Sequence, residues 1–285
     1  MTLPNDVRKT VSESYARAVE QPQASGCCCA GPAPQGVAAT LAGYSREALA
    51  ALPADAVQNS FGCGNPVALA EIREGETVLD LGSGAGIDLL LAAKLVGPRG
   101  RVLGVDMTPA MLERARANAT AAGLTNVEVC EGIIEALPVD ADSVDLVISN
   151  CVINLSPEKP RVFGEIHRVL KPGGRFSISD IVAEPMPDWV VELGQLYSAC
   201  ISGAIPEADY LAGLRTAGLC DVEVRDRLVY DPLQLLALLD SELGGACCGG
   251  SAPLSKGQLA RVTQALAGKV ASVRVVGRKP GGAAG

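Results

Sequence analysis

The chain has 285 residues, of which 48% are hydrophobic and 20% are charged, so it is too apolar to remain disordered. Its 32 acidic residues outnumber its 24 basic residues and give a net charge of −8, which argues against nucleic acid as a partner. A chain of this length is expected to bury roughly 70–75% of its unfolded surface, enough for one large domain or for a domain with a smaller companion.

Ten cysteines stand beside a single histidine, His167. We find no apolar secretory signal and no uninterrupted membrane span, so the sequence predicts a cytoplasmic protein without a membrane partner. Thiols stay reduced in that compartment, where clustered cysteines indicate metal, metalloid or redox chemistry more often than structural bridges. Because one histidine offers little to a mixed Cys/His zinc site, we expect a bound species that is held mostly by sulfur.

The first part of the chain is expected to be peripheral. A short helix is predicted at Val7–Val19, and small residues and prolines then surround Cys27, Cys28 and Cys29 in a loop. Four apolar strands and two helical segments follow in alternation, at Thr77–Leu81, Ile87–Val96, Arg101–Val105, Pro109–Ala122, Val127–Cys130 and Val144–Ser149. This alternation predicts an α/β fold with a doubly wound, mostly parallel, Rossmann-like sheet that is covered on both faces.

The pattern of elements weakens toward the end of the chain. We expect a helix at Pro157–Leu170, a turn at Lys171–Gly174, a strand at Arg175–Val182, helices at Trp189–Gly203 and Glu207–Ala217, a strand at Val222–Val229, a leucine-rich helix after Pro232 and a strand at Ser272–Gly277. A second cysteine-bearing loop is expected at Gly244–Gly250. Three regions are predicted: a mobile cysteine-containing segment over 1–60, a cofactor-binding domain over 61–186, and an α+β companion region over 187–285 that covers the substrate site.

The segment Val78–Gly86 (V-L-D-L-G-S-G-A-G) ends a strand and opens a helix, and its three glycines let a ligand approach the backbone. Asp106 ends the next strand 20 residues after Gly86, the interval at which an acidic side chain accepts hydrogen bonds from ribose hydroxyls. The glycine spacing differs from that of nicotinamide enzymes, and the carboxylate of Asp80 suits a cationic sulfonium group better than a pyrophosphate. The motif therefore predicts S-adenosylmethionine as the cofactor.

This strand, turn and acidic pair resemble the class I S-adenosylmethionine-dependent methyltransferases. Gly132–Pro138 stands where that superfamily often carries G-D-A-E-x-L-P, with Ile133 in place of the Asp that commonly binds the adenine amino group. Adenine is therefore expected to rest on apolar and backbone groups near Ile134. The resemblance and the motif together imply a cofactor site made of Asp80, Gly82, Ser83, Gly84, Gly86, Asp106, Met107, Ile134, Glu135 and Asn150.

Three cysteines are expected to meet above this site. Cys151 directly follows the strand Val144–Ser149, and ligands of open α/β sheets bind beyond the carboxyl ends of the strands. Cys63 lies on a glycine-flanked loop before the first sheet strand, where it is able to fold over the cofactor. Cys200 lies in a segment that we predict to be a helix of the substrate lid.

The strings G-C-G-N-P at Gly62–Pro66 and S-N-C-V-I-N-L-S at Ser149–Ser156 resemble the bacterial arsenite methyltransferases, as do the Cys200 segment and the N-terminal cluster. The resemblance implies that Cys63, Cys151 and Cys200 are the catalytic residues and bind trivalent arsenic as thiolates. It also implies that one of Cys27, Cys28 and Cys29 delivers arsenic or exchanges a disulfide. The implied substrate is arsenite or its thiol conjugates, the implied reductant is thioredoxin or glutathione, and a monomer is expected.

The residue types fit this chemistry, because trivalent arsenic prefers thiolates and three sulfurs leave its lone pair exposed on the fourth side. Two alternatives stay open: a methyltransferase for a small organic acceptor, and a non-catalytic metalloid-binding or sensing protein. Cys130 and Cys220 are expected to be ordinary packing residues. The pair Cys247-Cys248 captures metalloid at the surface or has no role.

Overall fold

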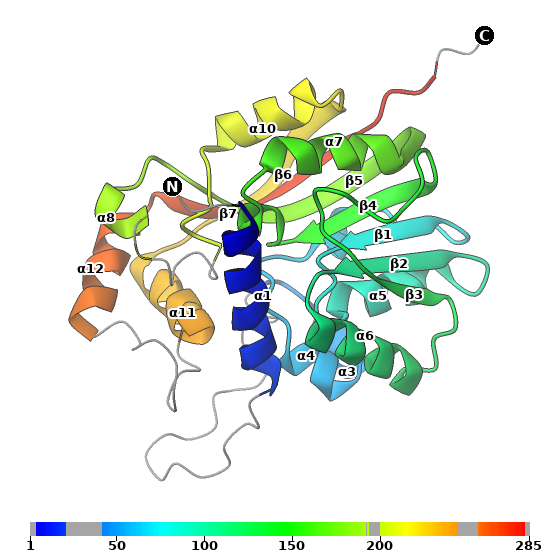
Figure 1. Ribbon diagram of the computed structural model, residues 1–285, viewed down its shortest axis with the longest axis horizontal. Coiled ribbons are helices and arrows are strands. Elements are labelled where there is room, and N and C mark those ends of the chain that lie inside the picture. The colour runs from blue at the N-terminus through cyan, green and yellow to red at the C-terminus, as the bar shows by residue number, and fades with distance from the viewer. Residues whose placement is uncertain (1–3, 21–41, 192, 194–199, 244–255, 283–285) are drawn as a thin grey trace.

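A seven-stranded sheet forms the centre of the part of the chain that the computed structural model describes, namely residues 4–20, 42–191, 193, 200–243 and 256–282 (Figure 1). The strands lie in the order β3-β2-β1-β4-β5-β7-β6. Their bounds are β1 Thr77–Leu81, β2 Arg101–Asp106, β3 Val127–Glu131, β4 Val144–Asn150, β5 Leu170–Ala183, β6 Cys220–Val229 and β7 Val270–Arg278. The pairs from β3 to β5 are parallel, whereas β7 pairs antiparallel with β5 and β6. The predicted doubly wound, mostly parallel sheet is confirmed.

Helices cover both faces of this sheet, because its inner strands are apolar on both sides. The helices are α1 Pro4–Glu20, α3 Arg46–Ala50, α4 Ala54–Gln58, α5 Ile87–Val96, α6 Pro109–Ala121, α7 Lys159–Val169, α8 Asp188–Val191, α10 Glu207–Thr216, α11 Pro232–Leu243 and α12 Lys256–Leu266, with 3-10 turns η1 Pro66–Leu69 and η2 Ile153–Leu155. Leu79 of β1 packs in a core with Phe163 of α7 and Tyr210 of α10. The adjacent Val78 faces the other way and packs with Leu89 of α5.

The order of the strands creates a crevice between β1 and β4. From β1 the chain winds outward through β2 to β3, and it then returns to β4 on the opposite side of β1. The connections diverge at the carboxyl ends of these two strands, which is where open α/β sheets bind ligands. Leu81, at the end of β1, pairs with Ser149 of β4. The glycine turn after β1 therefore lies beside the residues that follow Ser149.

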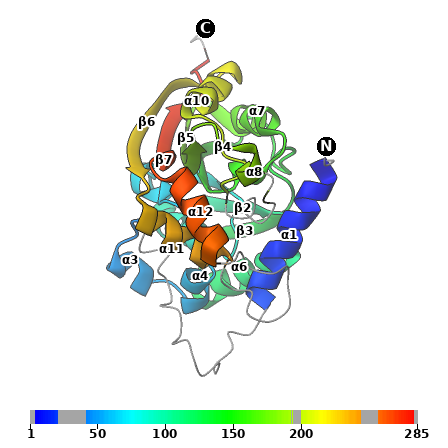
Figure 2. The ribbon, with the colours of Figure 1, turned by 90° about the vertical axis from the view of Figure 1, so that its left-hand side faces the viewer.

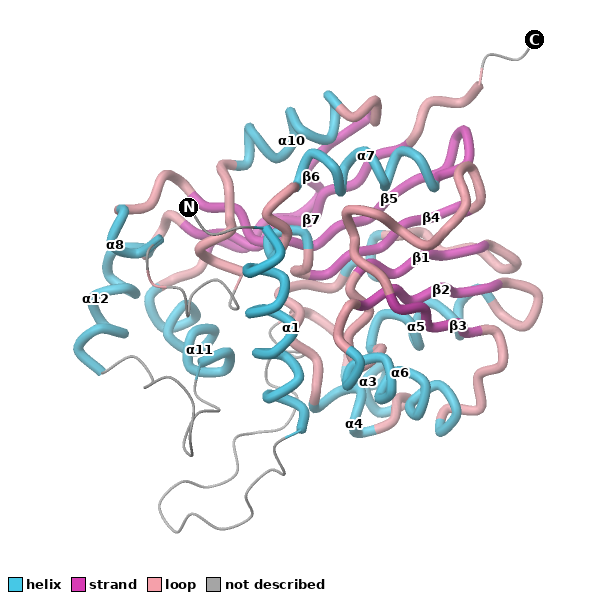
Figure 3. Tube along the Cα trace, in the orientation of Figure 1, coloured by secondary structure: helices cyan, strands magenta, loops and turns pink. Residues whose placement is uncertain are grey.

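The described part of the first sixty residues packs closely against the sheet instead of standing apart from it. Helix α1 lies beside the carboxyl ends of the parallel strands (Figure 3), and its Val11 and Val19 are 1% and 3% exposed. Tyr44 and Ala56 are also buried. The cysteine-rich stretch over 21–41 lies outside the described residues. The domain boundaries after residues 60 and 186 remain predictions.

Helices α8, α11 and α12 gather at the left-hand end of the molecule in Figure 1, and this end faces the viewer in Figure 2. Leu235 of α11, Val262 of α12 and Val190 of α8 are fully buried in a shared core. Helix α12 was not predicted, because Gly257 near its start disfavours a helix and its stability comes from this packing. Among the described residues, no helix combines the length and the apolar composition that are needed to cross a lipid bilayer.

Two predicted boundaries were wrong. The expected turn at Lys171–Gly174 lies inside β5, where Leu170 pairs with Val144 but the next pair joins Arg175 to Leu146. The sheet accommodates the extra residues as a bulge rather than ending the strand. The helix expected through Gly203 is described only as α8, and the chain is in a turn when it is described again at residue 200.

Candidate active site

A cavity opens at the carboxyl ends of β1, β2 and β4 and contains about 940 Å³ of empty space, including its open mouth. All the residues predicted to bind the cofactor line it: Asp80, Gly82, Ser83, Gly84, Gly86, Asp106, Met107, Ile134, Glu135 and Asn150. Cys151 lines the same cavity, so one predicted catalytic thiol position borders the predicted cofactor site.

The glycine turn after β1 forms the floor of this cavity. A side chain on Gly82 would overlap Val152, which follows β4, so only glycine lets the two segments approach this closely. The amide of Gly84 donates to the Asp106 carboxylate at 3.0 Å, and the amide of Thr108 donates to its other oxygen at 2.8 Å. The Asp106 carboxylate is thereby fixed at the end of β2, beside the turn.

Asp80 is a buried carboxylic acid in the wall of the cavity, and its surroundings do not fully stabilise its negative charge. Its side chain is 2% exposed, and Oδ2 has no hydrogen-bond partner among the residues that the structure describes. Burial, reinforced by the carboxylates of Asp88 and Asp106, raises the pKa of Asp80 well above its ordinary value. Burial likewise raises the pKa of Asp88 to about 6. A cationic ligand in the cavity would relieve this repulsion, so the donor set fits the charge of a sulfonium amino acid.

Glu135 is already bound by other protein groups. It accepts a hydrogen bond from Ser156 Oγ at 2.5 Å and one from Arg8 Nε at 3.2 Å, and Arg8 also pairs with Glu158 at 2.5 Å. These contacts fasten α1 to the segment after β4. The predicted role of Glu135 in cofactor binding therefore remains a prediction, whereas its role in holding α1 is visible.

Sequence analysis missed the side chains of α1 that line the cavity. Arg8, Val11 and Tyr15 reach it from one face of the helix, and the Tyr15 ring packs edge to face on Phe61 at a centroid distance of 5.5 Å. Their spacing of three and four residues places them on one helix face, a signal that was available in the sequence.

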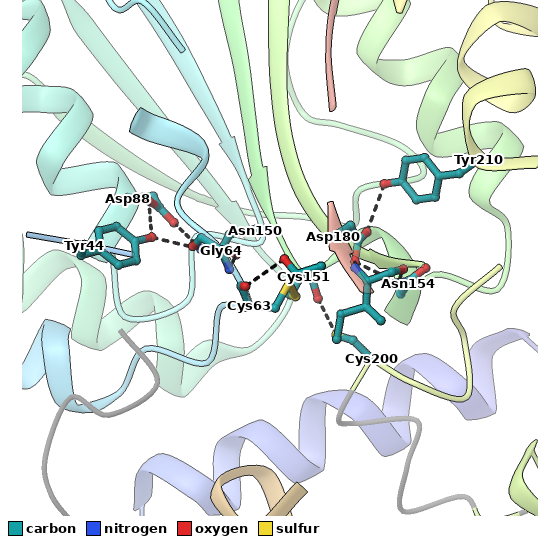
Figure 4. Close-up of a disulfide and its surroundings, with 12 residues drawn as sticks. Tyr44, Cys63, Gly64, Asp88, Asn150, Cys151, Asn154, Asp180, Cys200 and Tyr210 are labelled. Carbon is teal, nitrogen blue, oxygen red and sulfur yellow. Dashed lines mark hydrogen bonds between the residues drawn. A yellow bond between two sulfur atoms is a disulfide. The ribbon is translucent and has the colours of Figure 1, made fainter. Parts of the chain in front are cut away.

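The three cysteines predicted to bind arsenic come together at the edge of this cavity (Figure 4). Cys63 and Cys151 form a disulfide with a Cα–Cα distance of 5.8 Å. Cys200 Sγ donates to the carbonyl oxygen of Cys151 at 2.7 Å. All three residues are buried. The prediction of a helix at Cys200 was wrong. This residue lies in a turn with φ +57°, a left-handed conformation that a right-handed α-helix does not contain.

Asn150 holds the Cys63 loop against the end of β4. Its Oδ1 accepts from the Gly64 amide at 3.2 Å, and its Nδ2 donates to the Gly64 carbonyl at 2.7 Å. Nδ2 also lies 3.0 Å from Tyr44 Oη and from Asp88 Oδ2. A side chain on Gly62 would overlap the Asn150 amide group. The glycines that flank Cys63 therefore permit a close approach that sets the two cysteine segments side by side.

Asp180 is a further polar residue at the cysteines that the sequence did not single out. One of its carboxylate oxygens and the sulfurs of Cys63 and Cys151 all lie within 4.8 Å of one another. It accepts hydrogen bonds from Asn154 Nδ2 at 2.9 Å and from Tyr210 Oη at 3.1 Å. Burial raises the pKa of Asp180 to about 6. Its signal was an acidic residue near the end of a predicted buried strand, between Ser179 and Ile181.

The remaining cysteines lie away from this cluster or outside the described residues. Cys130 and Cys220 are half-buried free thiols, and Cys130 packs against the main hydrophobic core as expected. Burial raises the pKa of the Cys130 thiol, which disfavours its reactive form. Five predicted residues, Cys27, Cys28, Cys29, Cys247 and Cys248, fall outside the described residues.

Comparison with known proteins identifies the family. A family model described as a methyltransferase domain matches residues 72–235. The arsenite methyltransferase of Halobacterium salinarum is 44% identical over 233 residues, which cover 78% of this chain and 59% of that protein. The arsenite methyltransferase of Aquipseudomonas alcaligenes is 35% identical over 248 residues, which cover 83% of this chain and 67% of that protein. The chain thus spans less than two thirds of the length of the first of these relatives.

A solved structure extends the likeness to three dimensions. The arsenic (III) S-adenosylmethionine methyltransferase of Chlamydomonas reinhardtii superposes with a TM-score of 0.64 and is 37% identical. The match covers 83% of this chain and 74% of that chain. The methyltransferase domain and the extent of these similarities lead to one conclusion: the chain belongs to the family of arsenite methyltransferases.

Proposed function

We propose that this protein transfers methyl groups from S-adenosylmethionine to trivalent arsenic and thereby detoxifies arsenite. The observation that carries the proposal is the meeting of Cys63, Cys151 and Cys200 at the edge of a glycine-lined cavity. The names of the family members support the same reaction. All three cysteines belong to one chain, so the proposed site is complete in a monomer.

The cavity residues have complementary tasks in holding the cofactor. The unpartnered oxygen of Asp80 is placed to attract its cationic amino acid part, and the fixed carboxylate of Asp106 is placed for its ribose hydroxyls. Met107 and Ile134 offer apolar contact to adenine. When bound there, S-adenosylmethionine would supply a methyl group that its sulfonium charge has activated.

The cysteines bind arsenic only after reduction, because Cys63 and Cys151 are joined in the structure. A thiol reductant such as thioredoxin or glutathione, which the cytoplasm supplies, delivers two electrons and two protons to open this disulfide. Each of the three thiols then replaces one hydroxyl of arsenite and releases one water. Three sulfurs hold arsenic as a pyramid, and its lone pair remains on the side without a ligand.

The same two cysteines can supply the electrons that return arsenic to its trivalent state after each methylation. Methylation of the lone pair formally oxidises arsenic to the pentavalent state, and two electrons return it to the trivalent state. Oxidation of Cys63 and Cys151 to their disulfide releases two electrons, and the external reductant then restores both thiols. Burial of all three cysteines keeps bulk water away from the thiolates and the bound arsenic.

Product analysis tests the proposal. The purified protein is incubated with arsenite, S-adenosylmethionine and either glutathione or thioredoxin with its reductase, and arsenic species are separated by chromatography with mass detection. We expect methylated arsenicals, and none without reductant because two of the three thiols are then unavailable. Absence of methylated arsenic under conditions where arsenite and cofactor both bind would overturn the proposal. Methylation of an organic acceptor that survives loss of all three cysteines would favour the alternative enzyme.

A further inference from the structure

A second set of metal ligands overlaps the arsenic site. The sulfurs of Cys63 and Cys151 and a carboxylate oxygen of Asp180 lie within 4.8 Å of one another, and all three residues are buried (Figure 4). Trivalent arsenic prefers three sulfurs, so the proposed function makes no use of the carboxylate. Two thiolates with one carboxylate instead match the ligand preferences of a borderline-soft divalent cation.

The Asp180 carboxylate is oriented as a metal ligand would need to be. Its Oδ1 accepts from Asn154 Nδ2 and from the amide of Ile181, both at 2.9 Å. Its Oδ2 accepts from Tyr210 Oη at 3.1 Å. Carboxylates that bind metals are commonly held by such hydrogen bonds, which fix their direction. Each carboxylate oxygen has two acceptor positions, so Oδ2 keeps one after its bond with the tyrosine.

The local charges also favour a dication. Once the disulfide is reduced and both thiols are ionised, two thiolates and the Asp180 carboxylate place three negative charges in a buried space. Lys159 interacts electrostatically with Asp180 and with Cys200, and its Nζ donates to the backbone oxygens of Asn154 and Ser156 at 3.3 and 3.1 Å. The lysine supplies one positive charge, and a dication supplies the other two.

We propose that the reduced protein binds one thiophilic divalent cation, Zn²⁺ or Cd²⁺, through Cys63, Cys151 and Asp180, in competition with trivalent arsenic for the two thiolates. Tetrahedral Zn²⁺ holds sulfur at about 2.3 Å and oxygen at about 2.0–2.2 Å, which sets neighbouring ligand atoms about 3.5–3.8 Å apart. After the disulfide opens, the two sulfurs therefore have to move apart from bonding distance by rotation of their side chains, while the Asp180 oxygen already lies within 4.8 Å of both. Binding releases the two thiol protons to solvent, and water completes the coordination.

Cadmium titration of the protein reduced with a phosphine tests this site. The Cys63→Ser/Cys151→Ser double variant gives the baseline, because it retains all other cysteines. We expect the wild type to bind one more Cd²⁺ than this baseline, with the charge-transfer absorption of two thiolates. Asp180→Asn is expected to weaken this binding by about tenfold or more, whereas Cys200→Ser changes it by less than about threefold. Arsenite binding is expected to show the reverse pattern, unchanged in Asp180→Asn and weakened in Cys200→Ser, where only two thiolates remain.

Two results would overturn the inference: Cd²⁺ affinity in Asp180→Asn equal to that of the wild type, or loss of the site in Cys200→Ser, which would indicate three thiolates. Asparagine keeps the shape of Asp180, retains an acceptor for Asn154 and can donate to Tyr210. If that variant still fails to fold, the spectrum of the wild-type Co²⁺ complex counts the thiolates, and three would contradict the assignment. Cd²⁺ binding is measured without arsenic or cofactor, so its failure is distinct from failure of the proposed methylation.

Discussion

Replacing Cys151 by serine is expected to lower kcat/KM for arsenite methylation by about 10²-fold or more, because a serine oxygen is a poor ligand for a soft acceptor and arsenic loses its alignment. Cys151 follows β4 directly, lines the cofactor cavity and lies next to both Cys63 and Cys200. The measurement is the initial rate of formation of methylated arsenic at saturating S-adenosylmethionine.

Cys130→Ser serves as the matched control for this variant. Cys130 is a free, half-buried thiol in β3, outside the cavity lining. We expect its replacement to leave the methylation rate within about twofold of the wild type, as for a substitution away from the reacting groups. Cofactor affinity in Cys151→Ser is also expected to stay close to that of the wild type. Equal loss of activity in both variants would contradict a specific role for Cys151.

Asp80→Asn is expected to weaken S-adenosylmethionine binding by about 10- to 100-fold, the scale of a lost interaction with a buried charge. A bound cation would stabilise the ionised Asp80 carboxylate, because its Oδ2 is buried without a hydrogen-bond partner among the described residues. Asparagine keeps the shape of the side chain but removes the charge. Calorimetric titration of the reduced protein with the cofactor measures the change.

The same variant is expected to be more stable than the wild type without cofactor at neutral and higher pH. Burial and the nearby carboxylates of Asp88 and Asp106 raise the pKa of Asp80 above its value in the unfolded chain. Such a group contributes stability at pH values below its unfolded pKa and loses that contribution as pH rises through its folded pKa. The stability advantage of Asp80→Asn should therefore be small in acid and grow as pH rises.

Denaturant unfolding of the cofactor-free protein across this pH range gives the free energies of unfolding. Asp140→Asn, at an exposed position, is the control, and we expect it to change neither stability nor cofactor affinity. A fall in the relative stability of Asp80→Asn with rising pH would contradict the account. So would unchanged cofactor affinity, because the unpartnered carboxylate would then have no ligand to serve.

Much of the sheet domain could be predicted because its signals are local. The bounds predicted for β1 and α5 agree with the structure, since an apolar run and a glycine turn define them within the sequence itself. Signals that depend on partners were less informative. Lys171–Gly174 has the composition of a turn and is skipped in the pairing with β4, yet β5 begins before it, because Leu170 already pairs with Val144. Helix α12 is stabilised by burial of Val262 and Leu266 against other helices.

The residues of the candidate site also divide into those with a local sequence signal and those that tertiary packing places. The residues of the glycine turn and the position of Cys151 follow from one rule, that ligands bind at the carboxyl ends of parallel strands. Asp180 and Tyr15 each had a local signal, but only tertiary packing brings them to the site, so this signal could not be linked to it from the sequence. The position of Asn150 was recognised, but its side chain holds the Cys63 loop, a contact between segments 86 residues apart. Such a pairing leaves no local pattern in the sequence.

X-ray absorption at the arsenic edge tests the central claim most directly. The reduced protein is loaded with one equivalent of arsenite in the absence of cofactor, and the neighbours of arsenic are counted. The account predicts three sulfurs and no oxygen in the wild type, and two sulfurs with one oxygen in Cys200→Ser. Oxygen neighbours in the wild type would contradict it. Three sulfurs in the Cys63→Ser/Cys151→Ser variant would contradict it as well, because other cysteines would then hold the arsenic.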